Sequence, residues 1–128
     1  MGVTFSIIVP VFNEESVIDE FSKRILAVMD SLGKPFEVIF VDDGSTDATF
    51  QKACEWASKS RAIKAIRLSR NFGHQIAITA GIDAASGEAV VVMDGDLQHP
   101  PELIPEMAGK WAEGFHVVNT ARMETEGI

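Results

Sequence analysis

The chain has 128 residues, of which 46% are apolar and 23% charged, and its 11 Lys and Arg against 19 Asp and Glu give a formal charge of −8. The apolar content excludes a disordered chain, and the length suits one hydrophobic core. The acidic balance argues against general binding to nucleic acid or an anionic membrane, although it leaves room for a local basic site. We therefore predict one domain over residues 1–128 that does not bind nucleic acid.

Membrane and disulfide signals are weak in this sequence. No apolar run approaches the roughly 20 residues of a membrane-spanning helix, and the amino terminus lacks the basic region of a signal peptide. The single cysteine, Cys54, cannot form an internal disulfide, which fits a reducing compartment, and we expect it to be a small buried apolar residue. These features predict a soluble, cytoplasmic chain.

Short runs rich in Val and Ile alternate with longer amphipathic stretches, which is typical of a parallel sheet covered by helices. Strands are predicted over residues 5–12, 36–41, 63–68, 89–93 and 115–119. Helices are predicted over about residues 15–32 and after Thr46, Gly73 and Pro101. The pattern predicts an α/β fold, with a mainly parallel sheet of about five strands and helices on both faces.

Local signals refine two of the helices. Ser45 or Thr46 is placed to cap the second helix, whose buried face is expected to include Cys54. The third helix turns small side chains toward the sheet, which would let it lie close: Ala77, Ala80, Gly81 and Ala84.

Acidic side chains follow three of the predicted strands, where ligands bind in open α/β sheets. The groups are Asn13, Glu14 and Glu15, then Asp42 and Asp43 with Asp47 nearby, then Asp94 and Asp96. Like charges gathered at one edge need compensation by hydroxyls, amides or a cation. Favourable positions at helix N-termini explain Glu14, Glu15 and Asp47 equally well.

The Asp94-Gly95-Asp96 sequence predicts a divalent cation site, with Mg²⁺ or Mn²⁺ as the ion. Two carboxylates around a glycine at a strand end leave both side chains able to reach a hard cation, which completes its shell with water and phosphate oxygens. Gln98 would add a neutral oxygen, whereas His99 is interpreted as shaping the turn.

Asp42 and Asp43 end a strand as the ribose-binding acid of nucleotide folds does. The sequence has neither GxGxxG after its first strand nor GxxxxGK[ST], which disfavours a dinucleotide-binding domain and a P-loop. Arg67 and Arg70 would either meet diphosphate oxygens or balance the surrounding acids. His74 would either contact a ligand or cap its helix.

Four ordered motifs carry a family resemblance across nearly the whole chain. They are SIIVPVFNEE from Ser6, VDDGSTD from Val41, RNFGH from Arg70 and MDGDLQHPPE from Met93. The chain resembles the amino-terminal half of a family 2 glycosyltransferase with the GT-A fold. The last motif points to the polyprenyl-phosphate branch, which includes dolichyl-phosphate mannose synthase and bactoprenol glucosyltransferases.

The resemblance implies a sugar-nucleotide site. Pro10, Phe12, Glu14 and Asp42 would surround the base and ribose, with Asp43 nearby and Arg70 also assigned to the nucleotide. Asp94 would contact nucleotide and metal, and Asp96 and Gln98 would coordinate the metal, so that Asp94 and Asp96 are the expected catalytic residues. The reaction would transfer a sugar from UDP or GDP to a polyprenyl phosphate with inversion. The metal would neutralise the leaving diphosphate, and an anionic acceptor has little need of a general base.

Family members continue beyond the position of Ile128 into an acceptor region and usually membrane helices. The resemblance therefore implies that residues 1–128 supply the donor and metal site but do not turn over alone, and that the full-length enzyme acts at the cytoplasmic face of the membrane. Two alternatives stay open from the residues. One is a receiver-like, magnesium-binding signalling module, and the other is a non-catalytic fragment that self-associates into a homo-oligomer.

Overall fold

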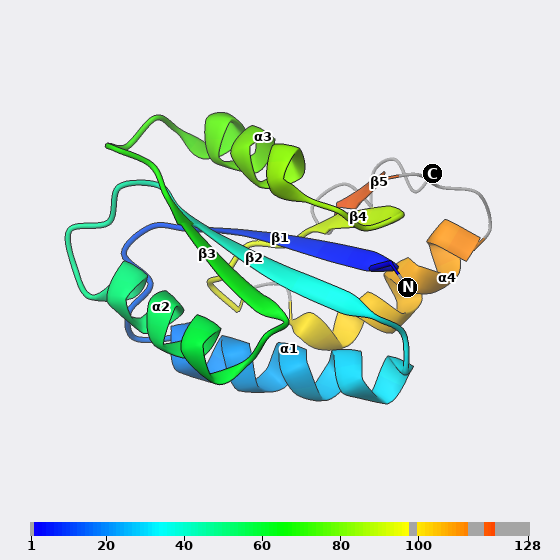
Figure 1. The fold of residues 1–128 in the computed structure, drawn as a ribbon. Helices are drawn as coiled ribbons and strands as arrows, with labels where there is room; N and C mark the ends of the chain where they lie inside the picture. The colour runs from blue at the N-terminus through cyan, green and yellow to red at the C-terminus, as the bar shows by residue number, and fades with distance from the viewer. Residues whose placement is uncertain (1, 98–99, 113–116, 120–128) are drawn as a thin grey trace.

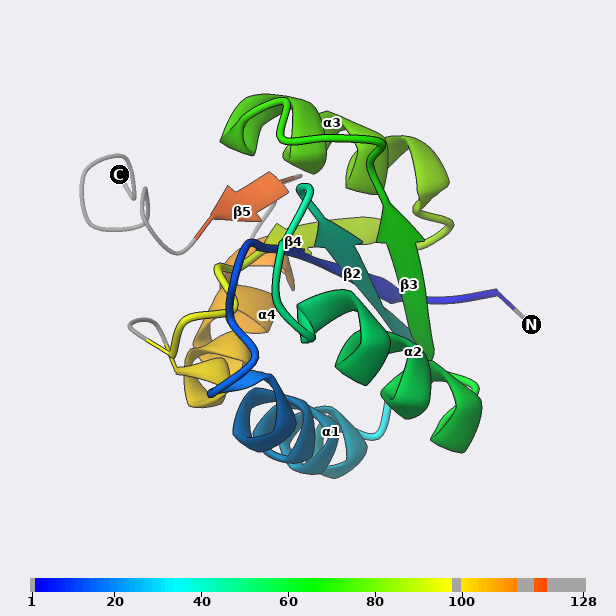
Figure 2. The ribbon, with the colours of Figure 1, turned by 90° about the vertical axis from the view of Figure 1, so that its left-hand side faces the viewer.

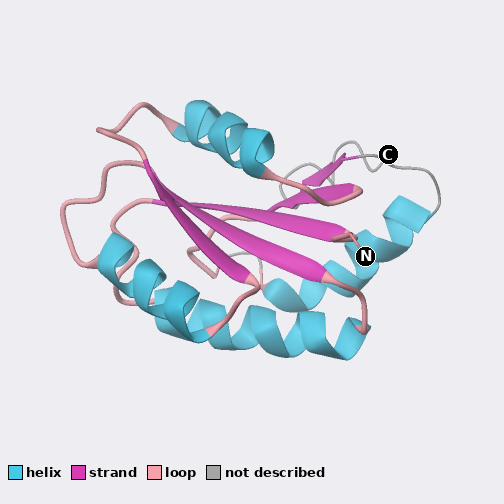
Figure 3. Cartoon of the chain, viewed as in Figure 1, coloured by secondary structure: helices cyan, strands magenta, loops and turns pink. Residues whose placement is uncertain are grey.

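A computed structural model describes residues 2–97, 100–112 and 117–119, without the side chains of 107, 110–112 and 117–119. These residues form a sheet in the order β3-β2-β1-β4-β5, and every neighbouring pair is parallel. The strands are β1 (Phe5–Val11), β2 (Phe36–Asp42), β3 (Ile63–Arg67), β4 (Ala89–Val92) and β5 (Val117–Asn119). The predicted α/β class is confirmed (Figure 3).

Helices cover both faces of the sheet, as predicted (Figures 1 and 2). They are α1 (Ile18–Leu32), α2 (Thr49–Lys59), α3 (His74–Ala84) and α4 (Ile104–Ala112). The α3 helix lies on one face, and α1, α2 and α4 lie on the other. Each helix connects two parallel strands, so the loops after the strands gather at one edge of the sheet.

Element ends differ from the predictions by a few residues. The first helix begins at Ile18 rather than near residue 15, because the amides of Val17 and Ile18 first close a turn on the carbonyl of Glu14. Before α4, a 3₁₀ turn spans Pro101–Leu103. Of the predicted fifth strand, residues 115 and 116 lie outside the described part of the chain.

Two apolar layers hold the helices to the sheet. Phe21 of α1 and Phe40 of β2 pack edge to face at a centroid distance of 6.1 Å in the larger layer. On the other face, a Cβ at Gly81 would overlap the Ile8 side chain and approach Val41 Cγ2 to 3.1 Å. The small inner surface predicted for α3 therefore brings this helix close to the sheet.

Two burial predictions are wrong. Ala84 is exposed at the last position of α3, where the following residue, Ala85, packs on the core of this face instead. Cys54 is also exposed, since Ala53 is the residue of this pair that α2 turns to the core. Adjacent residues on a helix point about 100° apart, so burial of one commonly exposes the next.

A buried carboxylate ties the amino-terminal ends of three strands together. Glu37 of β2 is 2% exposed, and it accepts hydrogen bonds from Ser6 Oγ at 2.6 Å, Ser86 N at 2.7 Å and Lys64 Nζ at 2.5 Å. Burial alone would raise its pKa, but the hydrogen bonds from Lys64, Ser6 and Ser86 outweigh burial and lower the pKa to about 2. The ionised form of Glu37 is therefore part of the native structure.

Replacing this carboxylate should change how stability depends on pH. The folded-state pKa lies below the unfolded value of 4.5, so the contribution of Glu37, about 3 kcal/mol, is complete well above pH 4.5 and disappears as pH falls toward 2. We expect Glu37→Gln to lower the free energy of unfolding at pH 7 and to flatten its decline between pH 4.5 and 2. Urea unfolding at several pH values measures both effects; an unchanged acid slope in the variant would contradict the assignment.

Candidate functional site

An open cavity of about 340 Å³ lies at the carboxyl edge of the sheet. Its wall combines residues from the ends of β1, β2 and β4 with the start of α3. The lining residues are Pro10, Val11, Phe12, Glu14, Asp43, Asn71, Gly73, His74, Ala77, Asp94 and Asp96. The structure thus brings together Pro10, Phe12, Glu14, Asp43, Asp94 and Asp96 from the predicted site.

The β1–α1 and β2–α2 loops are locked together by hydrogen bonds beside this cavity. Asn13 N donates to Ser45 Oγ at 2.8 Å, and Thr46 N donates to Asn13 Oδ1 at 2.9 Å. Glu14 N donates to the buried Thr49 Oγ1 at 2.8 Å. Asn13 has a φ of 54°, a left-handed conformation that Asn tolerates better than most residues. These contacts fix the backbone on either side of Phe12 and Glu14.

The start of α2 corrects the predicted helix cap. Neither Ser45 nor Thr46 caps this helix, because both bond Asn13 in the neighbouring loop. The first amides of the helix are satisfied by two acids instead: Ala48 N donates to Glu15 Oε1 at 2.7 Å, and Thr49 N donates to Asp47 Oδ1 at 2.9 Å.

This arrangement also separates the roles of the acids near α2. Glu15 and Asp47 stabilise the start of the helix, as the helix-terminus interpretation predicts. Glu14, by contrast, lines the cavity.

The two adjacent aspartates at the end of β2 have different environments. Asp42 is fully buried, where it accepts from Ser45 N at 3.3 Å and lies 3.7 Å from Arg67 Nε. Asp43 lines the cavity, and its carboxylate accepts from Phe72 N at 2.8 Å and Gly73 N at 3.1 Å. The structure therefore turns Asp43, rather than Asp42, toward the cavity, and Asp43 also anchors the segment that leads into α3.

Carboxylates dominate the electrostatics of the cavity. The pKa of Glu14 is raised by burial and by the negative charges of Asp96, Asp94 and Asp47. Gly95 lies between the two aspartates and packs on β1, where a Cβ would come within 2.7 Å of Val11 Cγ1. Opposite them, His74 Nε2 lies 3.5 Å from Asp94 Oδ1. A cation in this cavity would relieve the repulsion among the carboxylates.

The donor set fits a divalent cation that is shared with a ligand. Within the described residues, no three His, Cys, Asp or Glu side chains converge to hold a metal by themselves. Mg²⁺ is commonly bound through only one or two carboxylates together with phosphate oxygens, so Asp94 and Asp96 suffice on the protein side. The predicted ligand Gln98 and the neighbouring His99 lie outside the described part of the chain.

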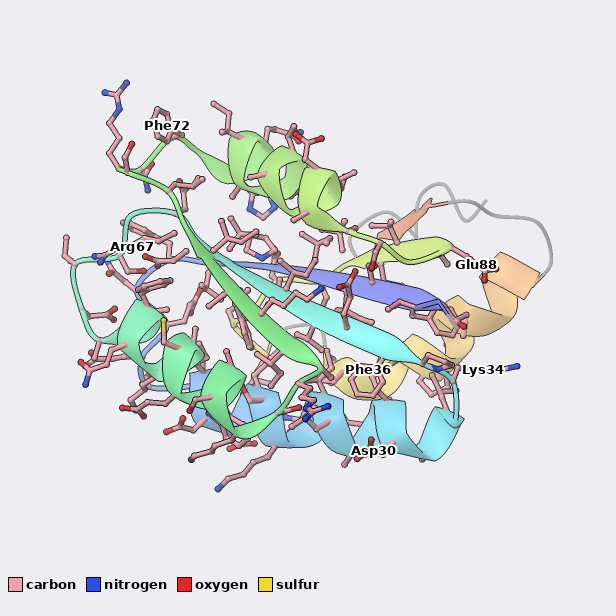
Figure 4. All side chains as sticks on the ribbon, in the orientation of Figure 1. Asp30, Lys34, Phe36, Arg67, Phe72 and Glu88 are labelled. Atoms are coloured by element: carbon pink, nitrogen blue, oxygen red, sulfur yellow. The ribbon has the colours of Figure 1, made fainter. Side chains whose placement is uncertain are left out.

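Arg67 and Arg70, for which diphosphate binding and compensation of nearby acids were both open, lie at a second hollow of about 480 Å³ beside the ends of β2 and β3. The guanidinium of Arg67 lies 5.1 Å from the Phe50 ring centroid, and that of Arg70 lies 4.7 Å from the Phe72 centroid. Figure 4 shows Arg67 and Phe72 at this end of the molecule. Arg70 is thus not among the residues that line the cavity with Asp94 and Asp96.

Sequence reasoning gave no role to Asn71 or Gly73, although both line the cavity. Both residues belong to the RNFGH motif, which is the sequence feature that could have indicated their place in the cavity. Gly44, with a φ of 81°, lies against this motif, and a Cβ there would be 2.5 Å from Asn71 N. The close approach of the two loops therefore requires a glycine.

Comparison with known proteins decides the family. The sequence profile of Glycosyl transferase family 2 matches residues 6–127. The chain belongs to glycosyl transferase family 2. This match confirms the predicted family and the prediction that the chain is a glycosyltransferase. It does not support the receiver-like alternative.

Two curated relatives illustrate the similarity. The chain is 50% identical over 125 residues to the uncharacterized glycosyltransferase YkcC of Bacillus subtilis, covering 98% of this chain and 39% of the relative. It is 38% identical over 122 residues to an undecaprenyl-phosphate 4-deoxy-4-formamido-L-arabinose transferase of Salmonella paratyphi A, covering 94% and 37%. The chain therefore spans well under half the length of these relatives.

Solved structures of glycosyltransferases share the fold, which confirms the GT-A prediction. Glucosyl-3-phosphoglycerate synthase from Mycobacterium tuberculosis, in complex with Mn²⁺, UDP and glucosyl-3-phosphoglycerate, matches with a TM-score of 0.69 and 27% identity, covering 86% of this chain and 40% of that one. The mannosyltransferase PcManGT from Pyrobaculum calidifontis, in complex with GDP-Man and Mn²⁺, matches with a TM-score of 0.65 and 28% identity, covering 87% and 32%. Across the residues described for the present chain, no helix has the length and apolar character to cross a membrane.

The lock between the two loops can be tested at Thr49. Thr49→Val keeps the shape of the side chain but leaves the Glu14 amide without its acceptor, which should cost about 1–3 kcal/mol of unfolding free energy. Thr49→Ser keeps the hydroxyl and should be milder. Urea unfolding of both variants measures the difference; a Thr49→Val variant that is as stable as the wild type, or less destabilised than Thr49→Ser, would contradict a stabilising role for the hydroxyl, which accepts from Glu14 N and donates to Asp47 Oδ1.

Proposed function

We propose that the cavity binds a nucleotide-sugar together with a divalent cation, and that the enzyme transfers the sugar, with inversion, to a polyprenyl phosphate. The observation that carries the proposal is the convergence of Glu14, Asp94 and Asp96 on one cavity with the aromatic Phe12. The solved relatives support it, because they hold Mn²⁺ with UDP or with GDP-mannose. Both UDP-linked and GDP-linked sugars are therefore candidate donors.

Each part of the cavity suits a part of the donor. The exposed Phe12 ring and the adjacent Pro10 offer an apolar surface for the base, and Asp43 offers an acceptor for its N–H groups or for ribose hydroxyls. Asp42 is buried, and it would act indirectly, by holding the Ser45 amide and the Arg67 guanidinium in place. Arg70 would have to leave the Phe72 ring to reach the donor.

Asp94 and Asp96, with Gln98 as the further predicted ligand, would hold the cation. When bound, a divalent cation supplies charge neutralisation for the leaving diphosphate. Gly95 keeps Asp94 and Asp96 at the end of the sheet by packing on Val11. His74, 3.5 Å from Asp94, would restrain that carboxylate.

The acceptor part of the proposal rests on the relatives. One of them is named for transfer to undecaprenyl phosphate. A phosphate acceptor carries negative charge near neutral pH, so its oxygen can attack without a strong general base. We propose that residues 1–128 supply the donor and metal site, that the acceptor is bound by the region corresponding to the remainder of the relatives, and that the full-length enzyme acts at the cytoplasmic face of the membrane.

Metal-dependent nucleotide binding tests the site directly. We expect calorimetric titration with UDP or GDP to show tighter binding in the presence of Mn²⁺, because the ion joins the carboxylates to the diphosphate. Asp96→Asn should weaken this binding roughly tenfold or more and abolish most of the effect of Mn²⁺.

Asp30→Asn is the matched control. Asp30 is an exposed carboxylate on α1 (Figure 4), so the substitution makes the same change in charge away from the cavity. Equal weakening by both variants, or no binding of either nucleotide, would contradict the proposed site. A chain that bound no nucleotide but formed oligomers would favour the self-associating alternative.

Turnover by the 128-residue chain tests the division between donor and acceptor sites. Incubation with sugar nucleotide, Mn²⁺ and polyprenyl phosphate should yield no glycolipid, even where calorimetry detects donor binding. Chromatography of the extracted lipid measures the product. Formation of glycosylated polyprenyl phosphate by this chain would overturn the assignment of the acceptor site to other residues.

A further inference from the structure

Positive charge is concentrated in one stretch of this acidic chain. From Trp56 to Ile82 the sequence carries five of its 11 Lys and Arg and none of its 19 Asp and Glu. We call these five residues the basic edge: Lys59, Arg61, Lys64, Arg67 and Arg70. They fall at intervals of two or three residues, before, within and after β3.

The fold places the basic edge at a border of the molecule. The β3 strand is the outermost strand of the sheet on its side, next to β2 alone (Figure 2). All five cationic side chains are exposed. Because a strand rises about 3.3 Å per residue, the stretch from Arg61 to Arg67 extends roughly 20 Å. Side chains alternate along a strand, so Lys64 and Arg67 leave β3 on opposite faces of the sheet, and the charges are spread along the edge rather than gathered in a compact cluster.

Most of this charge is free to act on a partner. Lys64 pairs with the buried Glu37, and Arg67 lies beside the buried Asp42, although both cations keep more than half of their side-chain surface exposed. The other three, Lys59, Arg61 and Arg70, form no ion pair with any residue in the described part of the chain. Exposed positive charge is therefore concentrated along β3 although the net charge of the chain is −8.

Aromatic rings accompany three of the five cations. Lys59 Nζ lies 5.0 Å from the centroid of Trp56, and Arg67 and Arg70 lie over Phe50 and Phe72. Phe72, just before α3, is 37% exposed, and Ile76 in the first turn of α3 is 49% exposed. Cationic side chains combined with exposed aromatic and aliphatic groups suit the boundary between lipid headgroups and acyl chains.

We propose that the basic edge docks the protein on an anionic membrane surface. The proposal rests on the proposed function only in that a polyprenyl phosphate acceptor resides in a membrane; it is independent of the donor and metal chemistry. Attraction to anionic headgroups falls off within about 8–10 Å in physiological salt, so the charges nearest the membrane decide the interaction, and here five exposed cations stand against the exposed Glu55 of α2 and Asp83 of α3. Membrane contact would thereby hold the domain at the surface in which the lipid acceptor resides.

Two other uses of these charges predict different results. Charged residues on an edge strand oppose pairing with the edge of another sheet, which would make Lys64 and its neighbours protection against aggregation. A line of cations with aromatic rings also suits single-stranded RNA. Membrane docking is favoured over RNA binding by the exposed aliphatic Ile76 together with Phe72, because an aliphatic side chain can enter the acyl region of a bilayer but offers no ring for base stacking.

Vesicle sedimentation with the 128-residue chain tests the proposal. We expect the chain to bind vesicles containing phosphatidylglycerol, to bind pure phosphatidylcholine vesicles weakly, and to be released by high salt. Each cation contributes about fivefold, so the double variant Lys59→Gln with Arg61→Gln should bind about 30-fold more weakly. The control, Lys23→Gln with Lys34→Gln, removes the same charge from α1 and the adjoining turn and should bind as the wild type does.

The outcomes separate this proposal from the proposed function. Selective loss of vesicle binding in the Lys59 and Arg61 variant, with unchanged nucleotide titration, supports the basic edge. Absence of vesicle binding by the wild type, equal loss in both double variants, or tighter binding to poly(U) than to vesicles would overturn it. Aggregation of the Lys59 and Arg61 variant with unchanged vesicle binding would likewise overturn it, in favour of edge protection. The titration with UDP or GDP is a separate measurement, and it tests the proposed nucleotide site alone.

Discussion

The exchange of hydrogen bonds between the β1–α1 and β2–α2 loops is the constraint on which the cavity depends. Parallel strands bring these loops side by side, but only side-chain partners fix their conformation. Asn13 bonds both Ser45 and Thr46, and Thr49 accepts from the amide of Glu14. Without these contacts, neither the left-handed backbone at Asn13 nor the placement of Phe12 at the cavity would be determined.

The acids at the carboxyl edge divide into two groups with different physical roles. Asp42, Asp47 and Glu15 are neutralised or satisfied within the protein, by Arg67 or by backbone amides. Glu14 and Asp94 instead face the cavity, where burial and the negative charges of neighbouring carboxylates raise the pKa of Glu14. The first group stabilises the folded conformation of the loops, and the second leaves negative charge available for a ligand. Asp43 belongs to both, since it anchors backbone amides while it lines the cavity.

Much of the fold was predictable because it depends on local periodicity. Runs of Val and Ile predicted the strands, and turn residues placed the acids at their ends. What the sequence could not predict was the choice of distant partners: Asp43 bonds the amide of Phe72, 29 residues away, and Thr46 bonds Asn13, 33 residues away. Those pairings depend on how far each loop extends past its strand. The sequence therefore could not predict that Ser45 and Thr46 bond Asn13 instead of capping α2, or that Asp43 lines the cavity while Asp42 is buried.

The buried Glu37 has a consequence for how this domain tolerates change. Its hydrogen bonds join β1, β2, β3 and the turn before β4 at the amino-terminal end of the sheet, opposite the loops that form the cavity. The groups that secure the strands and the groups that face a ligand therefore occupy opposite ends of the same sheet. Substitutions that strengthen the amino-terminal end offer a route to a more heat-resistant domain that avoids the usual conflict between stability and activity.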